Sequence, residues 1–304
     1  GKSHDATESP TARAVEIGRS RTVAPYLPAD IRLPDAIVVT SDLAAVGKVP
    51  IILAVTPAQA LRGVLAELKP TGKLVLCCKG VEQGTGALMT DVAAESAPDA
   101  EIFVLSGPNF AVEVARGLPA AATLAGPSVE AAQAVAAIIS TPTFRLYASG
   151  DRVGVALGGA LKNVIAIAAG AVEGAGLGEN ARAAVATRGL AEIARIAAAL
   201  GAERETLMGL SGVGDLLLCS APQSRNYSLG VALGQGRALA DILAERPSTP
   251  EGVATASAAH ALADRLGVDA PIVAAVDAVT AGRLDIKRAV QALLARPPAR
   301  DERA

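Results

Sequence analysis

The chain has 304 residues, a net charge of −2 at pH 7, and only 2% aromatic residues. A chain of this length can bury a real core and is expected to form two domains. The near-neutral charge argues against nucleic acid or acidic lipid as a general partner. No run of about 18 uninterrupted apolar residues indicates a membrane span.

Four short apolar runs in the first half predict β-strands at residues 37–40, 51–55, 73–78 and 102–105. A segment with helical spacing, residues 57–68, separates the second run from the third. Short runs that are apolar on both faces and alternate with helices are typical of a parallel sheet covered on both sides. Such a sheet binds ligands beyond the carboxyl ends of its strands.

Three loops therefore become candidate parts of a site, at residues 56–59, 79–82 and 106–109. Each of them follows the carboxyl end of a predicted strand. Taken singly, each loop is equally well explained as an ordinary turn between a strand and a helix.

From about residue 151 the pattern becomes nearly all helical, with helices expected at 152–172 and 180–200 and shorter ones to about 295. The Pro-rich, charged tail at 296–304 is expected to fray. We therefore predict an α/β protein, in which a Rossmann-like parallel sheet domain (1–150) precedes an all-α substrate and catalytic domain (151–304). The cleft between the two is the expected site.

A dinucleotide-binding domain is expected to open with a strand, a G-x-G-x-x-G turn and a helix. Residues 1–12 are polar and unpatterned, and the glycine pairs at 174–178 and 212–214 do not follow a strand. We therefore expect the sheet domain to lack its first glycine-rich unit. Without that unit, NAD(P)H binding is expected to be too weak for useful catalysis.

The chain contains three cysteines and two histidines. Cys77, Cys78 and Cys219 have neither a disulfide framework nor zinc-site spacing, so reduced thiols in a cytoplasmic protein are expected. His4 lies in a polar tail and His260 in an Ala-rich helical stretch, and neither suggests a Ser/His triad or a metal site. Proton chemistry is therefore expected to fall to Lys, Asp, Glu, Tyr or Cys.

Lysines are scarce, and two of them are placed informatively. Lys79 follows a predicted strand, and Lys162 lies within the apolar, glycine-flanked segment 158–167. Burying an ammonium group is costly unless it is paired. A functional role competes here with the alternative that Lys162 extends from a helix edge to solvent.

A second cluster contains Asp215 after two glycines and the run Ser224-Arg225-Asn226 at the start of a helical stretch. An Arg side chain at a helix N-terminus is suited to a phosphate or carboxylate. Asp215 and Ser224 are also well explained as helix caps.

Together these residues resemble the bacterial NAD(P)-dependent glycerol-3-phosphate dehydrogenases, from about residue 13 to 294. The resemblance rests on an ordered series of motifs: Tyr26-Leu27-Pro28, Cys78-Lys79-Gly80-Val81-Glu82, Leu105-Ser106-Gly107-Pro108-Asn109-Phe110-Ala111, Gly158-Gly159-Ala160-Leu161-Lys162-Asn163, Gly214-Asp215-Leu216, Ser224-Arg225-Asn226 and Glu251-Gly252-Val253.

The resemblance implies reversible reduction of dihydroxyacetone phosphate to sn-glycerol 3-phosphate with NAD or NADP, feeding glycerophospholipid synthesis. It implies Lys162 as the acid/base, oriented by Asp215. A homodimer is an assembly that such a chain could form. The implied substrate-binding residues are Lys79, Gly107, Asn109, Lys162, Asp215, Ser224, Arg225 and Asn226, and the implied cofactor-binding residues are Lys79, Ala111, Arg225, Thr249 and Glu251.

The sequence departs from the family pattern at the position four residues after Asp215. Relatives usually carry Thr there, whereas this chain has Cys219 and a spacing to Ser224 that looks one residue short. Ser220 is an alternative source of the lost hydroxyl. Asn109 and Thr249 also stand where relatives more often have Ser or Thr and an aliphatic residue, respectively.

Two other interpretations compete with this enzyme. One is a related two-domain reductase that uses a buried lysine, such as ketopantoate reductase or a 6-phosphogluconate dehydrogenase. The other is a catalytically impaired remnant that acts as an oligomerisation or small-ligand module. The Lys79, Gly107-Pro108 and Ser224-Arg225-Asn226 set argues against the related reductases. Whether the encoding DNA holds a glycine-rich strand–turn–helix unit upstream would separate the enzyme from the remnant. Preference between NAD and NADP is left open.

Overall fold

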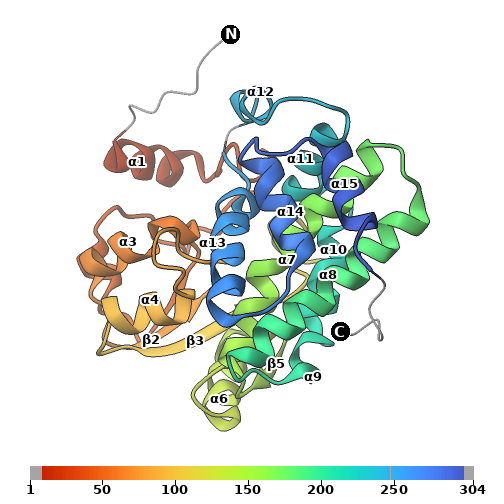
Figure 1. Cartoon of the computed structure of the whole chain (residues 1–304). Helices are drawn as coiled ribbons and strands as arrows, with labels where there is room; N and C mark the ends of the chain where they lie inside the picture. The colour runs from red at the N-terminus through yellow and green to blue at the C-terminus, as the bar shows by residue number, and fades with distance from the viewer. Residues whose placement is uncertain (1–8, 247, 298–304) are drawn as a thin grey trace.

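The computed structural model describes residues 9–246 and 248–297. His4 and most of the tail expected to fray fall outside these ranges. Figure 1 shows the sheet and its helices on one side of the molecule and a group of helices on the other. The long helix α7 runs through the middle of that group.

A five-stranded sheet forms the core of the first half, in the order β1-β2-β3-β4-β5. The pairs β1–β2, β2–β3 and β4–β5 are parallel, whereas β3 and β4 are antiparallel, so the predicted all-parallel sheet is correct except at one junction. The strands span Ile51–Ala54 (β1), Lys73–Leu76 (β2), Glu101–Ser106 (β3), Ala120–Ala125 (β4) and Phe144–Ser149 (β5).

Both faces of the sheet are covered, as expected. Alternate residues of β2 point to opposite faces, so Leu74 and Leu76 pack in one cluster and Val75 in another. Helices α3 (Leu61–Leu68) and α4 (Met89–Ser96) contribute to the first cluster, and α6 (Val129–Ile139) contributes to the second. The short elements η1 (Ala58–Ala60) and α5 (Ala111–Ala115) follow the carboxyl ends of β1 and β3.

The segment before the sheet contains α1 (Pro10–Ser20) and α2 (Leu43–Val46). The strand predicted at residues 37–40 was wrong, because these residues have no regular structure and Val38 is 86% exposed. A β-branched run forms a strand only where a neighbouring strand completes its hydrogen bonds. Among the described residues, β1 pairs only with β2, so it offers residues 37–40 no ladder.

The second half is helical. Its elements are α7 (Arg152–Gly174), α8 (Glu179–Ala199), α9 (Arg204–Leu207), the π-helical turn η2 (Leu210–Gly214), α10 (Asp215–Cys219), α11 (Arg225–Gly234), α12 (Leu239–Ala244), α13 (Glu251–Leu266), α14 (Pro271–Thr280) and α15 (Ile286–Leu294). Helix α7 is long and apolar enough to cross a membrane, but 89% of its apolar window is buried inside the protein. It is therefore the core helix around which the others pack.

Helices α7 and α11 approach each other closely because glycine occupies the contact. A Cβ atom at Gly170 would lie 2.1 Å from the Tyr227 carbonyl oxygen, and one at Gly230 would lie 2.1 Å from the Ile167 carbonyl oxygen. Real side chains do not fit at such distances. This contact fixes α11, with the Ser224-Arg225-Asn226 segment at its start, against the helix that carries Lys162.

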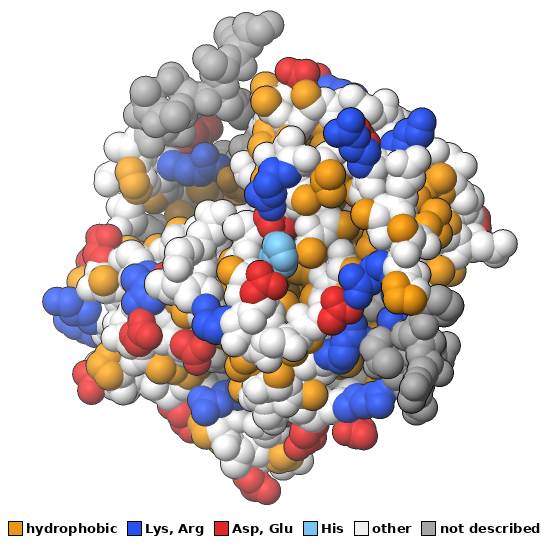
Figure 2. All heavy atoms as spheres, viewed as in Figure 1, with side chains coloured by type: hydrophobic (Ala, Val, Ile, Leu, Met, Phe, Trp, Pro, Cys, Tyr) orange, Lys and Arg blue, Asp and Glu red, His pale blue; other side chains and the backbone are white. Residues whose placement is uncertain are grey.

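The face of the molecule in Figure 2 presents acidic and basic side chains interspersed with small apolar ones. This mixture agrees with the net charge of −2. No single-sign field of the kind that attracts nucleic acid is visible on that face.

Candidate active site

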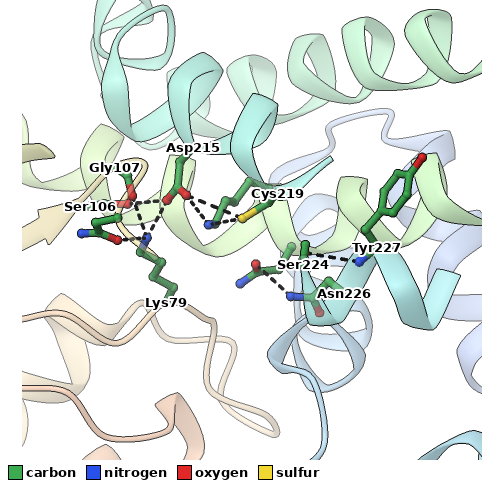
Figure 3. Close-up of polar contacts among 11 residues, drawn as sticks. Lys79, Ser106, Gly107, Asp215, Cys219, Ser224, Asn226 and Tyr227 are labelled. Carbon is green, nitrogen blue, oxygen red and sulfur yellow. Dashed lines mark hydrogen bonds and ion pairs between the residues drawn. The ribbon is translucent and has the colours of Figure 1, made fainter. Parts of the chain in front are cut away.

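Two lysines converge on one carboxylate where the sheet meets the helices (Figure 3). The Lys79 Nζ atom donates to Asp215 Oδ2 at 2.6 Å, and Lys162 Nζ donates to Asp215 Oδ1. Asp215 and Lys162 are 1% and 4% exposed, so the charged atoms are shielded from water. This arrangement excludes the two simpler interpretations: Asp215 caps no helix with its side chain, and Lys162 does not extend to solvent.

Three separate elements bring these side chains together. Lys79 lies in the loop after β2, Lys162 in the middle of α7, and Asp215 at the start of α10. The glycines before Lys162 make the approach close, because a Cβ atom at Gly158 would meet the Ser211 carbonyl oxygen at 2.7 Å and one at Gly159 would meet Ser106 Oγ at 2.4 Å.

The turn that aims Asp215 is π-helical, a form found mostly as single turns and often at functional sites. It spans Leu210–Gly214 immediately before α10. A Cβ atom at Gly212 would lie only 1.9 Å from the Leu207 carbonyl oxygen, so the turn accepts no side chain there. Gly212 is therefore a packing feature of the turn that delivers Asp215 into the site.

The two lysines that share the Asp215 carboxylate have pKa shifts in opposite directions. Burial and repulsion from the Lys162 ammonium group lower the pKa of Lys79, and contact with Asp215 offsets this only in part. Burial also opposes the charge on Lys162, but Asp215 and Cys219 outweigh it and raise its pKa. Lys162 is thus held as an ammonium group at the centre of the cluster.

Helix geometry decides which side chain after Asp215 contacts Lys162. Cys219 lies one turn further along α10, on the same face as Asp215, and its Sγ atom is 2.8 Å from Lys162 Nζ. The Ser220 hydroxyl is buried without a partner among the described residues. The alternative that Ser220 supplies the missing hydroxyl to Lys162 is therefore wrong, and sulfur occupies that place.

Ser106 is a site residue that the sequence analysis quoted within a motif but did not assign. It ends β3, is 1% exposed, and its Oγ atom lies 3.4 Å from Asp215 Oδ2. A polar residue that ends a buried strand was the signal available for it. Next to it, the Gly107 carbonyl oxygen accepts a hydrogen bond from Lys79 Nζ at 3.2 Å, and Asn109 Oδ1 lies 3.5 Å from the same nitrogen.

The segment at the start of α11 lies beside this cluster (Figure 3). Ser224 caps α11 by accepting a hydrogen bond from the Tyr227 amide, so this side chain has a structural role. Asn226 donates to Asn163 Oδ1 at 3.0 Å and accepts from the Gly252 amide at 3.0 Å, which ties α11 to α7 and α13. Ser224 therefore caps α11, and Asn226 holds the three helices together.

Arg225 differs from its two neighbours because it is exposed, and its side chain donates to the hydroxyl of Ser248 at 2.9 Å. Most of its five N–H donors are therefore available for an anion. It begins α11, where the helix dipole also favours negative charge.

The residues expected to hold a nucleotide lie in three places. Ala111 is exposed at the start of α5, Thr249 is exposed before α13, and Glu251 is the first residue of α13. Burial raises the pKa of Glu251, while the Ala58 amide and Arg225 oppose that shift. Glu251 therefore links α13 to the turn after β1.

One further observation tests whether a nucleotide fits here. The hydroxyl of Thr56, two residues after β1, is buried without a partner among the described residues. It lies at the carboxyl end of a parallel strand, where doubly wound sheets hold dinucleotides. The orphan hydroxyl, the exposed guanidinium of Arg225 and the ammonium of Lys79 form a donor set that fits an anionic nucleotide.

His260 lies away from this cluster. Its Nδ1 atom contacts Asp277 Oδ2 at 2.8 Å, which joins α13 to α14. The three cysteines are free, and no group of three or more metal-ligating side chains occurs among the residues that the structure describes. The chemistry of the cluster is therefore that of two lysine side chains around one carboxylate.

Comparison with known proteins follows the same division of the chain. A family model described as the NAD-dependent glycerol-3-phosphate dehydrogenase N-terminus matches residues 6–132, and one described as its C-terminus matches residues 151–291. Together they cover most of the sequence.

Curated relatives match at high identity. A glycerol-3-phosphate dehydrogenase [NAD(P)+] of Caulobacter vibrioides is 54% identical over 279 residues, covering 90% of this chain and 84% of that protein. One of Rhodospirillum rubrum is 51% identical over 298 residues, covering 96% and 84%. The crystal structure of a glycerol-3-phosphate dehydrogenase from Coxiella burnetii superposes with a TM-score of 0.88 at 34% identity, covering 94% of this chain and 89% of that one.

Proposed function

The chain belongs to the NAD-dependent glycerol-3-phosphate dehydrogenase family, and from this premise we propose that it interconverts dihydroxyacetone phosphate and sn-glycerol 3-phosphate with NAD(P)H. The observation that carries the proposal is the pairing of Lys79 and Lys162 on Asp215 at the carboxyl ends of the strands. The close relatives support this activity rather than an impaired remnant or a different lysine-dependent reductase.

The nicotinamide cofactor, when bound, supplies or accepts the hydride. The task left to the protein is to handle the proton at the carbonyl oxygen, which becomes an alkoxide during reduction. Lys162 would donate that proton as an ammonium group and recover it as a neutral amine in the reverse direction. Its raised pKa favours the charged form that reduction requires.

Asp215 would fix the direction in which Lys162 presents its proton. Its Oδ1 atom is occupied by Lys162 and its Oδ2 atom by Lys79, so the carboxylate holds both ammonium groups in place. Lys162, whose pKa is raised, would keep its positive charge in the cluster. Such a fixed field stabilises negative charge that develops on a substrate oxygen.

The phosphate and hydroxyl groups of the substrate need further donors. Arg225 offers a planar guanidinium at the start of α11, suited to bidentate recognition of a phosphate. We propose that Lys79, Gly107 and Asn109 line the reacting end. Ser224 and Asn226 would act at the other end, beside Arg225, through the part of their hydrogen-bonding capacity that the helix contacts leave free.

The cofactor-binding residues in this proposal are Lys79, Ala111, Arg225, Thr249 and Glu251. They flank the carboxyl ends of the strands and the start of α13. The Thr56 hydroxyl, which has no partner among the described residues, follows the carboxyl end of β1. Lys79 and Arg225 supply the positive charge that a pyrophosphate or a ribose phosphate would need.

We also propose that the boundary between the nucleotide-binding and the substrate domains lies near Gly150, between the end of β5 and the start of α7. The product would feed glycerophospholipid synthesis in the cytoplasm, and a homodimer would be the assembly. The small-molecule substrate agrees with the names of the relatives.

The activity is tested by following the oxidation of NADH and NADPH with dihydroxyacetone phosphate as substrate. Ketopantoate and 6-phosphogluconate, with the matching cofactor forms, serve as competing substrates. The relatives favour an active enzyme over the weak NAD(P)H binding expected from the sequence, so among these substrates we expect turnover with dihydroxyacetone phosphate only, with sn-glycerol 3-phosphate as the product. Turnover of either competitor at a comparable kcat/KM would reject the assignment.

A further inference from the structure

The Cys219 thiol lies inside the cluster that holds Lys162. It is 5% exposed, its Sγ atom is 2.8 Å from Lys162 Nζ, and it is 3.7 Å from Asp215 Oδ1 (Figure 3). Lys162 therefore has two acceptors on α10, one charged and one neutral. The other two cysteines, Cys77 and Cys78, precede Lys79 and form no hydrogen bond with Lys162 among the residues that the structure describes.

Helix geometry makes this second contact a fixed one. Asp215 and Cys219 are the first and last residues of α10 and face the same way, because residues four apart lie on one side of a helix. The π-helical turn before α10 sets the direction in which both side chains point from the helix. A buried ammonium group held by a single carboxylate could rotate about that contact, whereas two acceptors on one helix face define its direction.

We infer that Cys219 is a positioning residue for the proposed acid/base, which aims the Lys162 ammonium group by accepting a hydrogen bond on sulfur. This inference rests on the function proposed above. A thiol suits the place because it is neutral: it accepts from Lys162 without cancelling the positive charge that a developing alkoxide needs.

The ionisable groups around Lys162 are consistent with a neutral thiol. Burial raises the pKa of Cys219, and the nearby Lys162 ammonium group opposes this only partly. Asp215 supplies the negative charge, and Lys79 shares it from the sheet side. Contact with Cys219 is also one of the causes that raise the pKa of Lys162.

Helices α8, α11 and α13 also pack on α7, and one charged group on each of them is engaged elsewhere. Glu192 on α8 accepts from the amides of α14, Arg225 on α11 bonds to the hydroxyl of Ser248, and Glu251 on α13 bonds to the Ala58 amide. Burial, Asp215 and Cys219 therefore set the direction of the pKa shift of Lys162.

The test compares Cys219→Ala, which removes the acceptor, with Cys219→Ser and Cys219→Thr, which replace sulfur by a hydroxyl. Cys77→Ala is the matched control, since Cys77 packs against the hydrophobic cluster on the sheet. For Cys219→Ala we expect kcat for dihydroxyacetone phosphate reduction to fall about tenfold, the lower range for losing a hydrogen bond to a charged group. KM should change much less.

The pH profile separates positioning from a merely structural effect. Reduction requires charged Lys162, so activity is lost on the basic side as Lys162 deprotonates. Without Cys219 the pKa of Lys162 should be lower, and the basic limb of the kcat profile should move to lower pH in Cys219→Ala. Cys219→Ser or Cys219→Thr should restore the position of the basic limb and most of kcat. Cys77→Ala should change neither.

Three results would overturn the inference: an unmoved basic limb in Cys219→Ala, a loss of kcat without any rescue by serine or threonine, or an equal effect of Cys77→Ala. Each of these requires an active parent enzyme. An inactive parent with every substrate would instead reject the proposed function itself, so the two failures are distinguishable.

Discussion

Lys79 Nζ donates to Asp215 Oδ2 at 2.6 Å, across 136 positions of sequence. The lysine follows a strand of the sheet, and the aspartate begins a short helix in the other half of the chain. The carboxylate is 1% exposed, so it is buried and depends on its partners for compensation. The site can therefore form only when both halves have folded against each other.

Lys162→Ala should lower kcat by at least about a hundredfold, the low end for losing a general acid or base. The variant also leaves Asp215 paired with Lys79 alone. The measurement is the steady-state and single-turnover oxidation of NADH by dihydroxyacetone phosphate. Lys73→Ala is the control, because Lys73 forms a part-exposed ion pair with Glu101 at the far end of β2. A near-normal kcat in Lys162→Ala would remove Lys162 from the acid/base role.

Asp215→Asn keeps the shape of the side chain but removes the charge between two lysines. Lys162 then loses the main group that raises its pKa, so the basic limb of the reduction profile should shift to lower pH. Breaking a buried charge pair should also lower the stability, by roughly 3–5 kcal/mol.

Asp277→Asn is the control for that stability loss, because Asp277 is also buried and paired, with Arg283 and His260. It should lower Tm without moving the pH limb. If both variants move the limb equally, or if neither does, Asp215 does not set the charge state of Lys162.

Arg225→Lys should raise KM for dihydroxyacetone phosphate by about ten- to a hundredfold, corresponding to roughly 1.5–3 kcal/mol for a charged hydrogen bond. A lysine cannot reproduce the bidentate fork. Unphosphorylated dihydroxyacetone should be affected much less. Arg237→Lys, at an exposed ion pair with Glu245, is the control. Equal losses on the two ketones would place Arg225 away from the phosphate.

Glu192 should make stability depend on pH in an unusual direction. Burial raises the pKa of this carboxyl from 4.5 to about 7, and the amides of Ile272 and Val273 oppose the shift. Between these values the folded state binds the proton and the unfolded state does not, so stability falls as pH rises.

In the wild type, the free energy of unfolding relative to Glu192→Gln should therefore fall by about 1.4 kcal/mol per pH unit within that window. The readout is thermal or urea unfolding of both proteins from pH 5 to 7. Parallel curves for the two proteins would show that Glu192 is charged throughout. Glu179→Gln, an exposed carboxyl of the same helix, should leave the pH dependence unchanged.

Part of the fold could be predicted because short apolar runs that alternate with helical segments are typical of buried parallel strands. The strands β1, β2 and β3 match the runs at 51–55, 73–78 and 102–105, and α7 and α8 match the predicted helices within a few residues. Strand β4 was not predicted, because its sequence AAATLA is dominated by alanine, which has little strand preference. The run at 37–40 looked like a strand but has no partner strand to bond.

The sequence alone determined the kind of chemistry: with few histidines and no metal-ligand spacing, proton transfer had to fall to residues such as the scarce lysines. It also determined the two-part architecture, through the change from short apolar runs to long helical patterns. Which lysine meets which carboxylate was decided only by the tertiary structure, because Lys79, Lys162 and Asp215 come from three separate elements. The choice of Cys219 over Ser220 was likewise tertiary, since a one-residue step rotates a side chain by about 100° around a helix and turns it away from Lys162.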